Sequence, residues 1–317
     1  MHVVVTGGAG FIGSHLVDRL VVDGQSVTIL DDLSNGELKN VAAHLTNRDV
    51  KLKESDFLDE EVLAEVLPGS DVVVHLAAIV NVLRSVADPV SSRRINTEGT
   101  IRLLEQCVKH GVKRFVFASS AAVYGSTPPP LKEEFPPRPL SPYAASKAAG
   151  EAYCNSYFNS YGLETVILRF MNVYGPRRSG GPYSGVMTKF AEALYSGKPI
   201  IIYGDGNQTR DFVHVEDVVS SVVAAISNIA AIGETLNIGS GVPTSINSLA
   251  KLFISVSGKE VPIEYGRPRK AEVRASFADI SKAKAMLNYS PSISLSDGVK
   301  GYLEWYLENW QQTRVKE

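Results

Sequence analysis

The chain of 317 residues lacks several features that mark specialised protein classes. Its two cysteines, Cys107 and Cys154, are too few for a disulfide framework, and we expect both to be buried thiols of a reducing compartment. The longest apolar stretch, residues 72–83, is interrupted by His75 and Asn81 and is too short to span a bilayer. The N-terminus shows neither a basic region nor a cleavage site, so we expect a cytoplasmic protein without membrane contact.

An excess of charge of one sign is also lacking. Lys and Arg number 32 against 34 Asp and Glu, which disfavours nucleic-acid binders that depend on phosphate neutralisation. The six histidines show no HxxxH or Cys/His spacing, so we expect no metal, and His75 is interpreted as a structural residue. Hydrophobic residues make up 44% of the chain, enough to exclude disorder as its main state.

Short apolar runs alternate with helical patterns along most of the chain. Strands are predicted at residues 3–5, 27–30, 50–53, 72–75, 115–117, 165–168 and 235–238. Helices are predicted at 12–22, 60–67, 96–110, 143–161, 186–195 and 215–229. This alternation predicts an α/β fold with a doubly wound parallel sheet of the Rossmann type and a smaller, discontinuous C-terminal substrate lobe. We assign 1–169 and 213–239 to the dinucleotide-binding domain, and 170–212 and 240–317 to the substrate lobe.

A glycine-rich turn, TGGAGFIG at residues 6–13, follows the first strand and opens a helix. It fits the G-x-G-x-x-G spacing through Gly8, Gly10 and Gly13, and a second spacing through Gly7, Gly10 and Gly13. Backbone amides at a helix N-terminus can contact a pyrophosphate closely only where no Cβ intervenes. The turn therefore predicts a dinucleotide site.

Acidic residues follow the second and third strands. Asp31 and Asp32 begin 18 residues after Gly13, where a carboxylate binds both ribose hydroxyls of adenosine and repels a 2′-phosphate. This favours NAD over NADP, and the alternative of a solvated turn acid fits Asp32 better than Asp31. Asp56 and Phe57 could bracket the adenine, although an exposed loop acid gives the same pattern.

Tyr143 and Lys147 lie four residues apart on a predicted helix and so share a face. An ammonium close to the phenol is expected to depress the pKa of Tyr143 from roughly 10, which would make it a usable general base. The spacing alone favours a core tyrosine with a solvated lysine. The position of the pair at a helix start, downstream of a dinucleotide fold, favours the catalytic interpretation.

The whole chain resembles the extended short-chain dehydrogenase/reductases, specifically NAD-dependent nucleotide-sugar epimerases of the UDP-galactose 4-epimerase type. The matching segments are TGGAGFIGSHL at 6–16, HLAA at 75–78, NTEGT at 96–100, SSAAVYG at 119–125, the Tyr143/Lys147 pair, RFMNVYGP at 169–176, GDG at 204–206 and RDFVH at 210–214. Each segment is weak alone, whereas together they are specific.

This resemblance implies reversible C4 epimerisation of UDP-glucose and UDP-galactose, an activity of galactose metabolism, through a 4-keto intermediate with tightly bound NAD. Tyr143 would take the O4 proton, Ser120 would hydrogen-bond O4, and Lys147 would also bind the nicotinamide ribose. The implied NAD-binding residues are Gly7, Gly10, Phe11, Ile12, Gly13, Asp31, Asp32, Asn35, Asp56, Phe57, Leu76, Ala77, Ala78, Asn96, Tyr143, Lys147 and Phe170.

The resemblance also implies a UDP-sugar site. Its residues, besides Ser120 and Tyr143, are Asn172, Arg210, Arg269, Glu272 and Ser276. A guanidinium suits a diphosphate, although Arg210 could instead pair with Asp211. Ser276 falls beside the sugar C2 substituent, where a small side chain leaves room for an N-acetyl group, so UDP-GlcNAc and UDP-GalNAc are expected substrates as well.

Other activities of the same family remain alternatives. Dehydratases and decarboxylases resemble this chain but carry an acid just before the Val-Tyr-Gly segment, where Ala121 and Ala122 cannot transfer protons. Another nucleotide-sugar epimerase, a net reductase, and a non-catalytic NAD-binding regulator are further alternatives. The regulator is disfavoured because such proteins typically lose the Tyr143/Lys147 pair.

A homodimer is the last implication of the resemblance. Its interface would use the helices at 96–110 and 143–161, with an apolar surface supplied by Leu103, Leu104, Val108, Tyr153 and Tyr157. The alternative is that these side chains are buried against the sheet.

Overall fold

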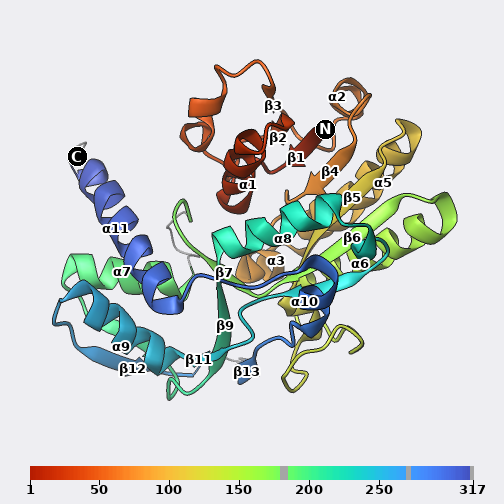
Figure 1. The fold of residues 1–317 in the computed structure, drawn as a ribbon. Helices are drawn as coiled ribbons and strands as arrows, with labels where there is room; N and C mark the ends of the chain where they lie inside the picture. Colours follow the sequence, from red (N-terminus) through yellow and green to blue (C-terminus); the bar gives the residue numbers. More distant parts are fainter. Residues whose placement is uncertain (179–184, 269–272, 315–317) are drawn as a thin grey trace.

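The structure, a computed structural model, describes residues 1–178, 185–268 and 273–314. Its centre is a parallel sheet with the strand order β10-β6-β5-β4-β1-β2-β3 (Figure 1). The strands are β1 (His2–Thr6), β2 (Ser26–Asp31), β3 (Val50–Glu54), β4 (Val72–His75), β5 (Arg114–Ser120), β6 (Glu164–Phe170) and β10 (Thr235–Ile238). The sequence-based prediction of a doubly wound parallel sheet is confirmed, since this order contains the Rossmann arrangement.

Helices cover both faces of this sheet. Side chains of Val3 and Val5 pack with α1 (Phe11–Val22) and α8 (Val215–Ser227), whereas Val4 between them packs on the opposite face. That opposite face is covered by α2 (Glu60–Val66), α5 (Gly99–Lys109) and α6 (Pro142–Tyr161) (Figure 1). Successive side chains of a strand point to opposite faces, so a strand buried on both sides needs a continuous apolar run.

The helix predicted at 96–110 is more complex than its sequence pattern indicates. It begins as a π-helical turn at Arg94–Glu98 and continues as α5. Two short helices precede it, α3 (Val82–Ala87) and α4 (Pro89–Arg93). Their caps explain where they start: Asn81 Oδ1 accepts a hydrogen bond from the Arg84 amide at 2.8 Å, and Asp88 Oδ1 accepts one from the Ser91 amide at 3.0 Å.

The remaining elements form smaller sheets and a separate core. A four-stranded sheet joins β7 (Asn172–Tyr174), β9 (Thr209–His214), β11 (Pro243–Ser245) and β13 (Ala275–Ser276), and β8 (Ile200–Tyr203) pairs with β12 (Ile263–Gly266). Helices α7 (Val186–Ser196), α9 (Ile246–Ser257) and α11 (Leu295–Arg314) pack around Phe190, Phe253 and Tyr302, at the lower left of Figure 1. Helix α10 (Ser281–Leu287) packs beside β10. The predicted domain boundaries stay a prediction.

The predicted dimer surface is partly wrong. Leu103 and Leu104 are fully buried in the core beneath α5, together with Phe115 of the sheet. Tyr153 on α6 is 40% exposed. The homodimer itself stays a prediction, and any interface on these helices has to use side chains such as Tyr153 rather than the two leucines.

Both cysteines are buried free thiols, as predicted. Among the described residues, no helix combines the length and apolarity needed to cross a membrane. Within those same residues, no group of three or more His, Cys, Asp and Glu side chains is arranged to hold a metal ion.

His75 has the structural role that its sequence position predicts. Its Nδ1 lies 2.7 Å from Thr6 Oγ1 and its Nε2 lies 3.1 Å from Thr100 Oγ1. Burial, together with the charge of Lys147, lowers the pKa of His75 to about 3, so the ring is neutral at physiological pH. It joins β1, β4 and α5.

Candidate active site

The turns after β1 and β4 meet at the centre of the sheet. β1 and β4 are adjacent, and the strand order reverses at this point, which is where doubly wound folds bind ligands beyond the carboxyl ends of the strands. Gly7 follows β1 with a φ of +70°, and a Cβ there would lie 2.8 Å from the Ala77 amide nitrogen in the turn after β4. Only glycine allows the two turns to approach so closely.

The remaining glycines let α1 start directly against this turn. The Gly10 amide donates to Gly7 O at 3.1 Å, and a Cβ on Gly13 would lie 2.1 Å from Gly7 O. Phe11 and Ile12 form the first turn of α1, whose first amides have no intrahelical partner and carry the positive end of the helix dipole. This cradle fits a dinucleotide pyrophosphate.

Asp31 and Asp32 differ in the way that the sequence indicated. Asp31 is buried, and its carboxylate accepts hydrogen bonds from the amides of Ala9 and Leu33, each at 2.9 Å. Burial raises the pKa of Asp31, and these hydrogen bonds oppose the increase. Asp32 is exposed and accepts from Ser34, as a solvated turn acid does, and its contact with NAD stays a prediction. Asp31 thereby ties the end of β2 to the glycine turn.

The other predicted NAD-binding residues range from exposed to buried. Asn35 and Asp56 are exposed, Leu76, Ala77 and Ala78 are half-buried, and Phe57 and Phe170 are buried. The Asn96 amide is satisfied within the protein. It accepts from Ile79 N at 2.8 Å and donates to Ser146 Oγ at 3.0 Å, so it joins the turn after β4 to α6. Direct contacts of these residues with NAD stay predictions.

Ser120, Tyr143 and Lys147 lie together at the carboxyl edge of β5. The Ser141 hydroxyl caps α6 by accepting from the Ala144 amide at 3.1 Å, which places Tyr143 in the first helical turn. The Ser120 hydroxyl lies close enough to the Tyr143 phenol to act on its pKa, and the Lys147 ammonium donates to Ala118 O at 2.7 Å. Strand β5 and helix α6, which are distant in the sequence, thus bring these three side chains together.

The predicted substrate residues Asn172, Arg210 and Ser276 come from three strands of the four-stranded sheet. Asn172 Nδ2 donates to Asp211 O at 3.2 Å, and Ser276 is paired with Arg210 in the β13–β9 register. The alternative salt bridge from Arg210 to Asp211 is wrong, because the fully buried Asp211 carboxylate accepts from Ser240, Gly241 and Ala278.

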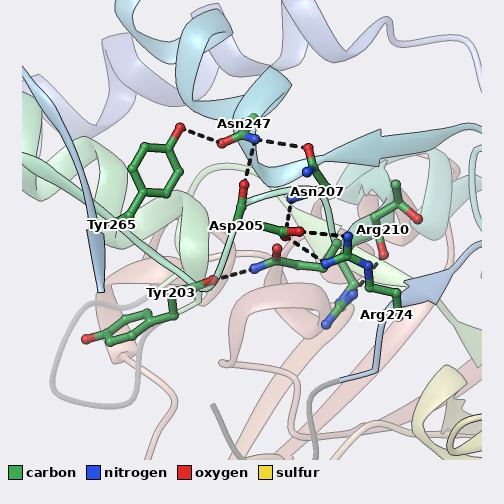
Figure 2. Close-up of polar contacts among 9 residues, drawn as sticks. Tyr203, Asp205, Asn207, Arg210, Asn247, Tyr265 and Arg274 are labelled. Carbon is green, nitrogen blue, oxygen red and sulfur yellow. Dashed lines mark hydrogen bonds and ion pairs between the residues drawn. The ribbon is translucent and has the colours of Figure 1, made fainter. Parts of the chain in front are cut away.

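A bidentate ion pair lies next to the predicted substrate residue Arg210. Arg274 binds both carboxylate oxygens of Asp205, at 2.7 and 2.9 Å, next to Arg210 (Figure 2). Hydrogen bonds from Arg274 hold the pKa of Asp205 below its ordinary value. Asn247 Nδ2 donates to Asp205 O at 3.0 Å and so fixes the same loop. The predicted ligands Arg269 and Glu272 lie outside the described residues.

Comparisons with known proteins agree with this geometry. Residues 3–239 match the family described as the NAD dependent epimerase/dehydratase family. A UDP-glucose 4-epimerase of Mycolicibacterium smegmatis is 40% identical over 96% of this chain and 98% of its own. The chain belongs to the NAD dependent epimerase/dehydratase family.

Solved structures of the family superpose closely on this chain. The UDP-glucose 4-epimerase of Thermotoga maritima, solved with UDP-glucose, gives a TM-score of 0.92 at 38% identity, covering 98% of this chain and all of that one. A UDP-N-acetylglucosamine 4-epimerase of Methanobrevibacter ruminantium gives 0.93 at 35% identity, covering 97% and 98%. Relatives named UDP-glucuronate 4-epimerase and dTDP-glucose 4,6-dehydratase are 34% and 33% identical. The protein is therefore an NAD-using member of a nucleotide-sugar family that spans several substrates.

The predicted depression of the Tyr143 pKa is wrong for this family member. Burial raises the pKa of the phenol, although the hydrogen bond from Ser120 and the charge of Arg178 oppose the increase. Burial also lowers the pKa of Lys147 to about 8, and its ammonium is directed at Ala118 O and over the Phe117 ring. Desolvation outweighs the pairing that the four-residue spacing suggested.

Two residues near the site escaped the sequence analysis. The Arg178 guanidinium lies 5.5 Å from the centre of the Phe11 ring and donates to Val173 O, so it bridges the glycine turn and β7. No sequence motif marks this arginine. Glu151 lies one helical turn beyond Lys147, and the same four-residue spacing that paired Tyr143 with Lys147 could have revealed it.

Proposed function

We propose that this protein catalyses the reversible C4 epimerisation of UDP-hexoses. The observation that carries the proposal is the proximity of the Ser120 hydroxyl and the Tyr143 phenol at the carboxyl end of β5, two strands from the glycine turn after β1. The similar proteins named UDP-glucose 4-epimerase support it.

Each side chain has a definite task in this reaction. The glycine turn at residues 7–13 would hold NAD, which would supply a hydride acceptor and donor for C4 of the sugar. The Tyr143 oxygen takes the proton from O4 and later gives it back, while the Ser120 hydroxyl orients O4. Asn172 and Arg210 would hold the diphosphate while the 4-keto sugar rotates to present its opposite face.

Positive charge is what a buried phenol needs in order to act as a base. Burial raises the pKa of Tyr143, and Arg178 acts in the opposite direction. Lys147 loses its proton at about pH 8, so its ammonium is present over the neutral range. The positive charge of Arg178 favours the phenolate form of Tyr143.

In this proposal, the side chain of Ser276, next to Arg210, determines which UDP-sugars are accepted. Ser276 is paired with Arg210 in the sheet register and is half-buried, so its small hydroxyl side chain leaves space that an N-acetyl group can fill. We therefore propose both UDP-glucose/UDP-galactose and their N-acetylated counterparts as substrates. The dehydratase alternative is disfavoured because Ala121 and Ala122 offer no group to transfer a proton.

The direct assay uses purified protein with UDP-galactose or UDP-N-acetylgalactosamine and no added NAD, with products separated by chromatography. We expect conversion of both sugars. Tyr143→Phe should lower kcat by about 10²–10⁴-fold with bound NAD retained, because it removes only the proton acceptor. Tyr153→Phe, on the exposed side of the same helix, is the matched control and should retain full activity. Failure to convert either sugar by NAD-loaded wild type would contradict the proposal.

A further inference from the structure

A buried ion pair lies directly behind the reactive residues. Glu151 lies four residues after Lys147 and eight after Tyr143 on α6, so all three side chains share one face of that helix. Glu151 and Arg169 are each only 4% exposed. None of the roles assigned above uses either residue.

One carboxylate connects three elements of the fold. Arg169 at the end of β6 donates from Nε to Glu151 Oε1 at 2.9 Å and from Nη2 to Oε2 at 2.7 Å. Ser119, the residue before Ser120, donates its hydroxyl to Glu151 Oε1. Ser119 and Arg169 are opposite each other in the parallel register, so Glu151 clamps the carboxyl ends of β5 and β6 against α6.

The position of Glu151 also determines which charge lies next to Lys147. Burial lowers the pKa of Lys147, and Cys154 and Glu151 act against this decrease. Burial raises the pKa of Cys154, so its thiol is neutral in the range in which Lys147 titrates. His75 is neutral there as well, since its pKa is about 3. Glu151 is therefore the negative charge next to Lys147 on its own helix.

Around Lys147, the ionisable side chains are Tyr143, Glu151 and Cys154 from α6, and His75 from β4, with Arg169 from β6 bound to Glu151. Arg169 keeps its own proton: burial opposes its charge, but the hydrogen bonds and charge of Glu151 outweigh burial and raise its pKa. The ion pair of Glu151 and Arg169 has no net charge, and its negative member, Glu151, lies on the same face of α6 as Lys147.

We propose that Glu151 is a positioning residue for the epimerase reaction: through Ser119 its carboxylate holds Ser120 in place relative to Tyr143, and from one helical turn away it keeps Lys147 charged. The proposal rests on the function proposed above. A purely structural explanation is weak, because a buried ion pair seldom stabilises a fold more than packed apolar side chains would.

The same two strands supply a matched control. Arg114 and Glu164 are also opposite each other in the β5–β6 register, at the amino ends of the strands, and Arg114 binds Glu164 Oε2 at 3.0 and 2.8 Å. Arg114 is 5% exposed, as buried as Arg169. The two pairs lie about 16 Å apart along the strands. They differ in their distance from the reactive residues and in the burial of the carboxylate, since the Glu164 side chain is 24% exposed and the Glu151 side chain 5%.

The test compares Glu151→Gln, Glu151→Asp and Glu164→Gln in the full-length holoprotein. Lys147 is titrated by NMR with ¹³Cε-labelled lysine, assigned by its absence in Lys147→Met, and kcat is measured across pH. In Glu151→Gln we expect the Lys147 titration and the alkaline limb of kcat to move down by about one pH unit, because a nearby negative charge is lost. Glu164→Gln should leave both where the wild type has them.

Glu151→Asp keeps the charge but shortens the reach. We expect Lys147 to titrate as in the wild type and kcat to fall about tenfold at every pH, because one short carboxylate cannot hold both Ser119 and Arg169. If Glu151→Gln does not fold, Glu151→Asp alone tests the proposal, and an unchanged kcat in Glu151→Asp overturns it. Equal behaviour of Glu151→Gln and Glu164→Gln also overturns it. Because the NMR titration needs no substrate, a wild type inactive on UDP-hexoses refutes the proposed function while leaving the role of Glu151 decidable.

Discussion

Replacing Gly7 by alanine should disrupt NAD binding through a single contact. Gly7 has a φ of +70°, and an added Cβ would lie 2.8 Å from the Ala77 nitrogen and 3.0 Å from its Cα. Gly24, just beyond α1, has a φ of +69° and nothing within 4 Å of the same added atom. The two substitutions impose the same backbone strain, and only Gly7→Ala also creates a clash.

The expected magnitudes follow from this difference. An alanine in the left-handed region costs roughly 1–2 kcal/mol, partly offset by about 0.4–1 kcal/mol from the stiffer unfolded chain. Gly24→Ala should therefore lower the free energy of unfolding by about 1 kcal/mol and leave NAD affinity unchanged. In Gly7→Ala the atoms at 2.8 and 3.0 Å are backbone, closer than the 3.4 Å of ordinary contact, so the turn after β4 must move. We expect NAD affinity to fall at least tenfold, or about 1.4 kcal/mol.

Urea unfolding and calorimetric titration with NAD, on protein stripped of its cofactor, measure both quantities. The wild type and Gly24→Ala should bind NAD alike, and Gly7→Ala should bind it at least tenfold more weakly. If Gly7→Ala binds NAD as tightly as Gly24→Ala, the turns after β1 and β4 do not form the cofactor cradle, and the site has been placed wrongly.

Three further changes test separate parts of the site. Ser276→Tyr should lower kcat/KM for UDP-N-acetylgalactosamine relative to UDP-galactose by tenfold or more, because a clash leaves no favourable pose; an unchanged ratio removes Ser276 from the C2 pocket. Arg210→Gln should raise KM for UDP-sugars and spare NAD affinity, whereas weakened NAD binding would assign Arg210 elsewhere. Burial lowers the pKa of Lys147 from its ordinary 10.5 to about 8 in the folded protein, so the unfolded chain binds more protons between these two pH values. As pH rises through that window, the free energy of unfolding of the wild type should therefore increase relative to that of Lys147→Met, by up to roughly 3 kcal/mol. If urea unfolding gives the same difference between the two proteins at every pH, Lys147 is not a buried ammonium.

The sheet was predictable because its strands are buried on both faces. Val3, Val4 and Val5 form a continuous apolar run, which only a strand covered by helices on both sides tolerates. The glycine turn and Asp31 were predictable for a related reason, since a close backbone approach requires glycine and leaves a local trace in the sequence. The predicted start of α1 differs from the observed Phe11 by one residue.

The rest depends on contacts between residues far apart in the chain. Strands β7, β11 and β13 are only two or three residues long, and the pairing of Ser276 with Arg210 of β9 is set by the fold rather than by local pattern. The pKa of Tyr143 was predicted in the wrong direction because spacing shows which side chains are neighbours and not how much water is excluded. The clamp of Glu151 on Arg169 was overlooked because the two are 18 residues apart.

The measurement that tests the central claim most directly follows the hydrogen at C4. Purified protein is given UDP-galactose carrying deuterium at C4, without added NAD, and the product is examined by NMR and mass spectrometry. The account predicts UDP-glucose that retains the deuterium at C4, because the hydride leaves and returns at the same carbon. Deuterium found at C6, as dehydration would place it, or lost from the sugar altogether, would contradict the account.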